Sequence, residues 1–337
     1  MILAWTVISA FVAALLLTTF IREYALRHRI LDIPNERSSH EAPTPRGGGL
    51  AIAVVMIVAL IVLWLAGVVP ARLAAALTVG GAAIAALGWI DDKHGLAALP
   101  RGLVQLGAAI VAVVLLGGVP VIHIGEFALR VGLAGSLLAV VLIVWFTNLY
   151  NFMDGIDGLA AGEAVSVGLI AALLLWNVSA PLAIVAGVMA ASSAGYLVWN
   201  WPPAKIFMGD SGSGLLGYSF AVLALASENA GALPTLWWIV LLGAFTFDAT
   251  ITLVRRVLQG KAIYQAHRDH AYQRLVRYGR THRAVTSAVL ALNIVLAALA
   301  WAGWRASTPV ALAIVTFALI LLAAPYLWVE RRLPMGG

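Results

Sequence analysis

The chain has 337 residues and a formal net charge of +6, and 62% of its residues are hydrophobic while only 11% are charged. Soluble domains carry roughly 25% charged residues, so this composition excludes a soluble globular protein. It predicts an all-α polytopic membrane protein, with residues 1–337 forming a single domain. The absence of cysteine from the sequence excludes disulfides, thiol catalysis and cysteine-ligated metal centres.

Apolar segments of about 20 residues, the length that crosses a bilayer as a helix, recur along the whole chain. The first begins at Ile2 without a preceding basic residue, so we expect a retained span and not a cleaved signal. The hydropathy predicts about eleven transmembrane helices, near residues 2–21, 47–66, 72–90, 102–118, 134–150, 163–177, 181–199, 212–227, 236–254, 284–303 and 308–328.

Basic residues predict the orientation of these helices. Of the 21 lysines and arginines, only Arg72, Arg130 and Arg305 lie outside the loops after odd-numbered segments and the C-terminal tail. Because positive loops stay in the cytoplasm, the N-terminus is predicted outside and the C-terminus cytoplasmic. Most acidic and histidine side chains share that face, which suggests a soluble cytoplasmic substrate meeting a partner at the inner leaflet. They lie in loops 22–46, 91–101, 148–162, 200–212 and 255–283.

The first of these loops is rich in proline and glycine and ends in "PRGGG", in which three glycines follow Arg46. Such a loop could expose backbone N–H groups and one guanidinium to an anion. The alternative is a basic juxtamembrane stretch that is attracted to anionic lipid.

The second loop begins with the adjacent carboxylates Asp91 and Asp92 and continues to Arg101. Paired carboxylates could bind a divalent cation, or one of them could act as a base. A solvated turn is the alternative, although a position between two membrane spans favours a functional site.

The third loop, "NLYNFMDGIDGLAAGEA", carries Asn148, Asn151, Asp154 and Asp157 at a spacing of three residues. On a helix this spacing places all four side chains on one face. A helix cap needs only one such residue, so the stripe favours a binding site. Asn148, and also Glu163 further along, could serve only as caps.

The fourth loop contains Lys205, Phe207 and Asp210 ahead of a segment that opens with small residues. A flat aromatic ring beside Lys and Asp suits a nucleotide base and its phosphates, whereas Asp210 could also be a simple N-cap. Ser213 and Gly217 form a small pair suited to close helix packing.

The fifth loop is basic and contains "HRDHAYQ". His267 and His270 could share a helix face, but Arg268 between them argues against a closed zinc site. Positive groups for phosphate are the favoured interpretation, and positive-inside topology alone is the alternative. Asp248, inside the ninth segment, is either functional or a local partner of Thr252.

Taken together, "DIPNERSSHEAPTPRGGGLAI", "DDKHGL", "NLYNFMDGIDGL", "KIFMGDSGS" and "HRDH" occur in order over roughly residues 20 to 285. This set resembles the polyprenyl-phosphate N-acetylhexosamine-1-phosphate transferases. The resemblance implies a bacterial inner-membrane helical bundle whose active site faces the cytoplasm. It implies transfer of a sugar 1-phosphate from a UDP-N-acetylhexosamine to undecaprenyl phosphate, with Mg²⁺ (or Mn²⁺ in its place) and release of UMP.

The resemblance also implies roles for the nucleotide pocket. By motif position, Asp210 matches the magnesium ligand, Phe207 the aromatic that stacks on uracil, and Asp157 the residue at the uracil edge. Asn151 and Asp154 match positions that line the same pocket near the diphosphate. The implied partners are the two substrates and the lipid bilayer, with no nucleic acid and with a homodimer as a further possibility.

The same resemblance gives the acidic pair Asp91 and Asp92 the preparation of the acceptor phosphate, without distinguishing which is the base. Arg46 and Arg101 are expected to neutralise phosphate charge. The fifth loop is expected to recognise sugar and phosphate, through His267, Arg268 and His270.

The fifth loop departs from the patterns of the best-known members, because Tyr272 and Gln273 stand where the GlcNAc enzymes have histidines. The "HRDHAYQ" form resembles the branch that initiates O-antigen synthesis. It argues against a peptide-bearing substrate and suggests GlcNAc or a 6-deoxy relative such as FucNAc or QuiNAc.

We expect direct attack of the acceptor phosphate on the β-phosphorus, and an aspartyl-phosphate intermediate is the alternative mechanism. A different class of function, a cation-coupled transporter with the acidic loops as ion sites, would require ionisable groups near mid-bilayer and inverted repeats.

Overall fold

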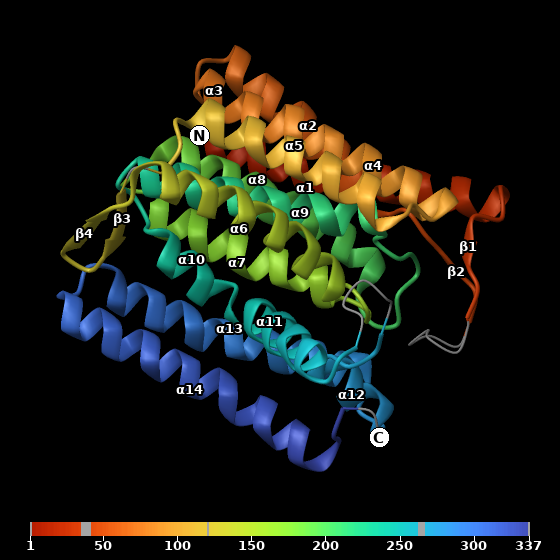
Figure 1. Ribbon diagram of the computed structural model, residues 1–337. Coiled ribbons are helices and arrows are strands. Elements are labelled where there is room, and N and C mark those ends of the chain that lie inside the picture. The colour runs from red at the N-terminus through yellow and green to blue at the C-terminus, as the bar shows by residue number, and fades with distance from the viewer. Residues whose placement is uncertain (1, 35–41, 120, 262–266, 336–337) are drawn as a thin grey trace.

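The computed structural model describes residues 2–34, 42–119, 121–261 and 267–335. It is a helical bundle with two short β-hairpins, and 76% of it is helical (Figure 1). The prediction of a helical, polytopic membrane protein is confirmed at this level. Residues 35–41 of the first predicted loop and 262–266 of the fifth lie outside the described residues.

The helices follow the predicted apolar segments. Their bounds are α1 Ile2–Arg27, α2 Gly49–Leu65, α3 Ala71–Ala75, η1 Ala76–Gly80, α4 Gly81–His94, α5 Ala98–Leu116, α6 Gly132–Phe152, α7 Leu159–Leu175, α8 Ala180–Asn200, α9 Asp210–Asn229, α10 Thr235–Leu241, α11 Gly243–Leu258, α12 Ala271–Arg277, α13 His282–Trp304 and α14 Thr308–Arg332. Two antiparallel hairpins are formed by β1 Leu31–Asp32 with β2 Thr44–Pro45, and by β3 Val121–Ile124 with β4 Phe127–Arg130.

Every one of the eleven predicted segments overlaps a helix or a broken helix. Within the described chain, seven helices are long and apolar enough to cross a membrane, or eight if the bent pair α10–α11 is one span. The helices α2 and α7 are apolar but only 17 residues long. The number of crossings therefore stays a prediction, as does the orientation of the termini.

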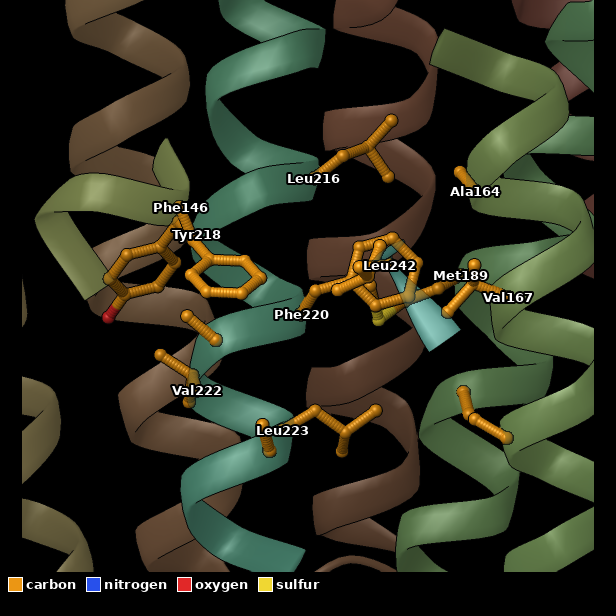
Figure 2. Packing of buried hydrophobic residues seen from close by; sticks show 14 of the residues in the cluster. Phe146, Ala164, Val167, Met189, Leu216, Tyr218, Phe220, Val222, Leu223 and Leu242 are labelled. Atoms are coloured by element: carbon orange, nitrogen blue, oxygen red, sulfur yellow. The ribbon is translucent and has the colours of Figure 1, made fainter. Parts of the chain in front are cut away.

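Helix α9 forms the centre of the bundle, and every residue from Ser211 to Glu228 is buried. It packs against α2, α4, α6 and α8, so protein and not lipid surrounds it. Figure 2 shows apolar side chains of α6, α7 and α8 together with Leu216, Phe220 and Leu223 of α9. Small residues allow the close approach, since a Cβ on Gly217 would lie 2.2 Å from the carbonyl oxygen of Phe146.

Two of the predicted spans are interrupted. In the third, the π-helix η1 separates α3 from α4, and the Tyr218 hydroxyl donates to the Ala76 carbonyl at 2.8 Å. In the ninth, predicted as one helix, α10 and α11 meet at 84°. Leu242 leaves the helical conformation at this bend, and the Thr246 hydroxyl donates to its carbonyl at 3.1 Å. Hydropathy continues across both breaks, so the sequence pattern does not reveal them.

Large apolar side chains are exposed on the outer faces of the bundle, as a bilayer-embedded surface requires; examples are Leu16, Val62, Val114, Leu133 and Ile320. The two termini lie at opposite ends of the bundle, as Figure 1 shows. The β3–β4 hairpin lies at the end of the N-terminus, whereas the β1–β2 hairpin and α12 lie at the other end.

Candidate active site

The described parts of the five loops predicted to carry function meet at the end of the bundle that holds β1–β2 and α12 (Figure 1). Close contact between α4 and α9 brings the second and fourth loops together. A Cβ on Gly88 would lie 2.4 Å from the backbone of Asp210 and Ser211, so only glycine permits this approach. Because Asp91 and Asp92 follow Gly88 by one helical turn, they come to lie beside the first turn of α9.

Arg46 joins the two acidic loops. Its Nη2 lies 2.7 Å from Oδ1 of Asp92 and 3.3 Å from Oδ1 of Asp210. The backbone N–H of Asp210 also donates to Oδ1 of Asp92 at 3.1 Å. Burial opposes the charged form of Arg46, but the surrounding carboxylates, Asp92 and Asp210 foremost, together outweigh it and raise the pKa of the guanidinium. Arg46 therefore offsets the repulsion between Asp92 on α4 and Asp210 on α9, which helix packing brings together.

Replacing Arg46 with glutamine is expected to destabilise the protein. Asp92 is only 5% exposed and would lose its counter-charge, which for a buried pair costs roughly 3–5 kcal/mol. Arg46 is itself 35% exposed, so solvent screening reduces the expected loss to roughly 1–3 kcal/mol. Thermal unfolding in detergent measures it, with Arg27→Gln at the exposed end of α1 as the control. Equal melting temperatures for both variants would contradict this role of Arg46.

A second ion pair lies beside the first. Nη1 of Arg101, on α5, lies 2.8 Å from Oδ2 of Asp91, whose other oxygen accepts the backbone N–H of Leu96 at 2.5 Å. Asp91, Arg101, Asn151 and Asp210 line one small polar cleft between α4, α5, α6 and α9. The structure therefore brings six predicted residues together here, because Arg46 and Asp92 adjoin this cleft through Asp210.

The glycine run of the first loop has a different role from the one predicted. The N–H groups of Gly47 and Gly48 donate to the Phe207 carbonyl at 3.1 and 2.9 Å, and that of Gly49 donates to Met208 at 2.9 Å. The prediction that this run exposes N–H groups to an anion is wrong. The donors instead join the first loop to the fourth and fix the backbone of half-buried Phe207 beside Arg46.

The third loop does not form the predicted helical stripe. Helix α6 ends at Phe152 and α7 begins at Leu159, so Asp154 and Asp157 lie in the connection. Gly158, directly before α7, adopts φ +74°, a conformation that favours glycine. Asn148 bonds with Gln105 at 2.7 and 3.3 Å and does not cap a helix.

Asp157 faces away from the acidic cleft. Its Oδ2 accepts the N–H of Ala204 at 3.0 Å, and its Oδ1 lies 3.2 Å from Nδ1 of His282. The third loop is thereby joined both to the fourth loop, three residues before Phe207, and to α13. His282 was not among the predicted residues, because nothing in the sequence near residue 282 marks a partner 125 positions away.

Asp154 lies toward the acidic cluster and is half-buried. The pKa of its carboxyl is raised well above the usual range because burial disfavours the charged form, and the negative charge of Asp210 adds to this effect. Arg46 opposes the shift without cancelling it. Asp154 therefore holds a proton more readily than an ordinary aspartate and can donate a hydrogen bond to a phosphate oxygen.

The fifth loop is less positive toward the site than predicted, because carboxylates bind several of its arginines. Arg255 and Arg274 each lie 2.6 Å from a carboxylate oxygen of Glu330 on α14, and Arg256 pairs with Asp269. Glu330 was missed because its partners come from two other helices. These arginines hold the loop in place, so the interpretation of all its positive groups as phosphate ligands is wrong for them.

The rings of His267 and His270 lie inside this loop, with centroids 4.9 Å apart, and their side chains are 9% and 2% exposed. The pKa of His267 is lowered to about 4, mainly by burial and in addition by the neighbouring His270 and Arg256. Nδ1 of His267 accepts the backbone N–H of Asp269 at 3.3 Å. His267 is thus neutral at pH 7, with Nε2–H as its donor. Arg268 lies between the two histidines in the chain and is half-buried.

Acid is expected to destabilise the protein through His267. An unfolded histidine titrates near 6.5 and the folded one near 4, so the unfolded state binds more protons between these values. Stability is therefore lost as pH falls from 7 through 6.5 toward 4. When the pH is lowered from 7.5 to 5.5, the melting temperature of the wild type should fall further than that of His267→Gln. Titration of Asp154 has the opposite effect on stability, but it occurs in both proteins and so cancels in the comparison. An equal decrease in melting temperature for the two proteins would contradict the prediction.

The residues present fit a magnesium site of the kind that substrate completes. Among the described residues, no three His, Asp or Glu side chains converge as a ready-made metal cage. Mg²⁺ usually needs only one or two carboxylates, with water and phosphate oxygens completing the shell. Asp210, 21% exposed beside Asp91 in the polar cleft, offers such a carboxylate.

Comparison with known proteins defines the class to which this site belongs. Residues 74–228 match the model of glycosyl transferase family 4. This range contains Asp91 and Asp92, the third loop and Asp210. The matches to whole proteins given next extend over most of the chain. The chain belongs to this family of polyprenyl-phosphate N-acetylhexosamine-1-phosphate transferases, as the resemblance of its five motifs implied.

Three relatives illustrate the range of the family. The chain is 33% identical to the probable undecaprenyl-phosphate N-acetylglucosaminyl 1-phosphate transferase of Bacillus subtilis, over 82% of this chain and 79% of that protein. It is 34% identical to the decaprenyl-phosphate N-acetylglucosaminephosphotransferase of Mycobacterium tuberculosis, over 79% and 73%. It is 32% identical to the phospho-N-acetylmuramoyl-pentapeptide-transferase of a Synechococcus strain, over 80% and 82%.

Proposed function

We propose that this protein transfers an N-acetylhexosamine 1-phosphate from a UDP-sugar to undecaprenyl phosphate, giving an undecaprenyl-diphosphate sugar and UMP. The observation that carries the proposal is the bridge that Arg46 makes between Asp92 and Asp210, beside the Asp91–Arg101 pair. Two phosphorylated substrates repel each other, so their reaction requires fixed positive groups and a metal-binding carboxylate in one place.

Direct displacement is the mechanism that the contacts favour. An oxygen of the lipid phosphate attacks the β-phosphorus of the UDP-sugar, the new P–O bond forms, and the bond from that phosphorus to the bridging oxygen breaks to release UMP. Asp91 and Asp92 are 8% and 5% exposed and are bound by arginine and backbone donors. They are therefore placed to orient Arg101 and Arg46 and not to attack phosphorus themselves.

An exchange experiment separates the two mechanisms. With radiolabelled UMP, unlabelled UDP-sugar and no lipid acceptor, direct displacement gives no labelled UDP-sugar. An aspartyl-phosphate intermediate would return label to the UDP-sugar at a rate comparable to turnover. The base has little to do in either case, because a phosphate monoester with a second pKa of about 6 is mostly ionised at neutral pH.

Magnesium enters the proposal through Asp210, with Mn²⁺ as a substitute. The ion would neutralise charge on the diphosphate and acceptor oxygens that complete its shell. Phe207 would stack on the uracil ring, while Asp157 and Asn151 would lie along the nucleotide. Asp157 also holds Ala204 and so supports the backbone that carries Phe207. Asp154, with its raised pKa, would donate to a phosphate oxygen.

GlcNAc is the sugar that we expect first, because the matched relatives from B. subtilis and M. tuberculosis are named for N-acetylglucosamine. The "HRDHAYQ" loop keeps FucNAc and QuiNAc as the second expectation. The product would initiate O-antigen or another cell-envelope glycan in a bacterial inner membrane, with the active site facing the cytoplasm.

The decisive experiment combines purified protein, undecaprenyl phosphate and Mg²⁺ with a panel of UDP-N-acetylhexosamines, scored by lipid-linked product. Product with one donor and none in the presence of EDTA supports both the activity and the metal. Uptake of solute into vesicles without any lipid-linked sugar would favour the transporter alternative. The bent pair α10–α11 resembles the broken helices of transporters, so both assays are worth performing.

The absence of native cysteine makes the predicted topology directly testable. Glu126→Cys, in the exposed turn between β3 and β4, should react with an impermeant maleimide added to intact cells. His94→Cys, at the exposed end of α4 near the site, should react only after the membrane is opened. The opposite labelling pattern would reverse the orientation and place the site outside the cytoplasm.

A further inference from the structure

Asp248 is a buried carboxylate on α11, six residues after the bend with α10, and it lies outside the acidic cleft. Its carboxylate gathers donors from two elements. Oδ1 accepts the N–H of Ala271 at 2.9 Å and the hydroxyl of Thr252 at 3.0 Å, and Oδ2 accepts the N–H of Tyr272 at 3.2 Å. Nδ1 of His270 lies 3.5 Å from Oδ1. The side chain of Asp248 thus accepts hydrogen bonds from the backbone N–H groups at the start of α12, although it lies 23 residues away in the chain.

This arrangement replaces the usual local cap. The residue at the N-cap position of α12 is His270, whose side chain makes no capping bond. A Ser, Thr, Asn or Asp at that position would cap the helix more simply. Here a histidine occupies that position, and the capping carboxylate comes from Asp248 on α11. As a result, the position of α12 depends on where the bent span carries Asp248.

The start of α12 also touches the third loop of the candidate site. The Tyr272 hydroxyl donates to the Phe152 carbonyl at 2.9 Å. A Cβ on Gly155 would lie 2.2 Å from that hydroxyl and 3.0 Å from Nε2 of Gln273. The ring of His270 also stacks on Phe152, with centroids 6.2 Å apart. Asp248 and the third loop therefore both hold the start of α12, at Gly155, the residue that follows Asp154.

We infer that Asp248 is a positioning residue for donor recognition. It docks the segment from His267 through Gln273 against the third loop, and in doing so it forms the wall that distinguishes one N-acetylhexosamine from another. The inference rests on the proposed function, since it assumes a UDP-sugar in the pocket beside Asp154. Asp248 itself touches no substrate.

Asp248→Asn is the appropriate test because it keeps the side-chain volume. Its amide would direct N–H groups at the backbone N–H of Ala271 or Tyr272, so one capping bond is lost. KM for UDP-GlcNAc should rise about tenfold, the effect of losing one cap, and the preference between UDP-GlcNAc and UDP-GalNAc should shrink. Inhibition by UMP, which has no sugar, should stay within about twofold of the wild type.

Glu163→Gln is the matched control. Glu163 is another fully buried carboxylate, on α7, where it accepts a bond from Nδ2 of Asn293 at 2.6 Å and touches no part of α12. In the structure it lies inside α7, after the third loop has ended, so KM and sugar preference should stay at wild-type values. A common loss of active protein in both variants, with KM and preference unchanged, would show that Asp248 is merely structural. Equal weakening of UMP inhibition and UDP-sugar binding would also overturn the inference.

Hydrogen exchange separates this inference from the proposed function. The amides of Ala271 and Tyr272 should exchange at least about tenfold faster in Asp248→Asn than in the wild type, whether or not transfer to lipid is detected. Unchanged exchange would refute the docking role of Asp248. Normal docking with no transferase activity in the wild type would instead refute the proposed function and leave the cap intact.

Discussion

Asp210→Asn is expected to lower turnover by about 10²–10³-fold, the usual cost of removing one electrostatic stabiliser of a transition state. The substitution keeps the shape of the side chain and leaves the backbone bond from residue 210 to Asp92 in place. It removes the carboxylate that we propose for magnesium and one of the two acids that Arg46 contacts. Formation of lipid-linked sugar from UDP-GlcNAc measures the effect.

The same variant should be at least as stable as the wild type. Asp210 lies in a cluster of like charges, and its repulsion contributes to the raised pKa of Asp154. Neutralising it relieves that repulsion, so the melting temperature should stay constant or rise. Glu23→Gln, at the exposed end of α1, is the control for loss of one negative charge. Wild-type turnover in Asp210→Asn would contradict the assignment of the site.

Gly88→Ala is expected to damage both stability and activity. The added methyl would meet the backbone of Asp210 and Ser211 at 2.4 Å, and backbone atoms cannot move aside as a flexible side chain can. Overpacking of this kind costs typically 1–3 kcal/mol, and we expect a value of about 3 kcal/mol because α4 must move away from α9. That movement would separate Asp92 from the first turn of α9 and from Arg46.

Gly107→Ala on α5 is the control for this experiment. A Cβ at Gly107 meets no atom within 4 Å, so its effect should not exceed about 1 kcal/mol, and it favours the helix. Thermal unfolding and lipid-product assays are measured on both variants. A Gly88→Ala protein with wild-type stability and turnover would show that the approach of α4 to α9 does not form the active site.

Much of the candidate site was predictable because its residues stand in short motifs at the ends of apolar segments. Asp91, Asp92, Asn151, Asp154 and Asp210 lie together at one end of the bundle, as their place in the chain suggested. What the motifs did not reveal was how these groups pair. Local spacing predicted one helical face for the third loop, but α6 ends at Phe152, and Asp157 instead accepts the N–H of Ala204.

Partners far apart in the chain were missed for a consistent physical reason. Glu330 binds Arg255 and Arg274, and Asp248 caps α12, only because α11, α12 and α14 pack against one another. The sequence does mark Asp248 as unusual, since a carboxylate in an apolar span needs a partner. Nothing in it identifies which of several loops supplies that partner.

By itself, the sequence determined that this protein is a helical membrane protein, and it predicted a candidate site in five loops, because hydropathy and motif order are local properties of the chain. The tertiary structure alone decided that α9 is enclosed by protein, that the ninth segment bends by 84°, and that Arg46 bridges Asp92 and Asp210. These features depend on glycines that let helices touch and on charges that meet only after the helices have packed.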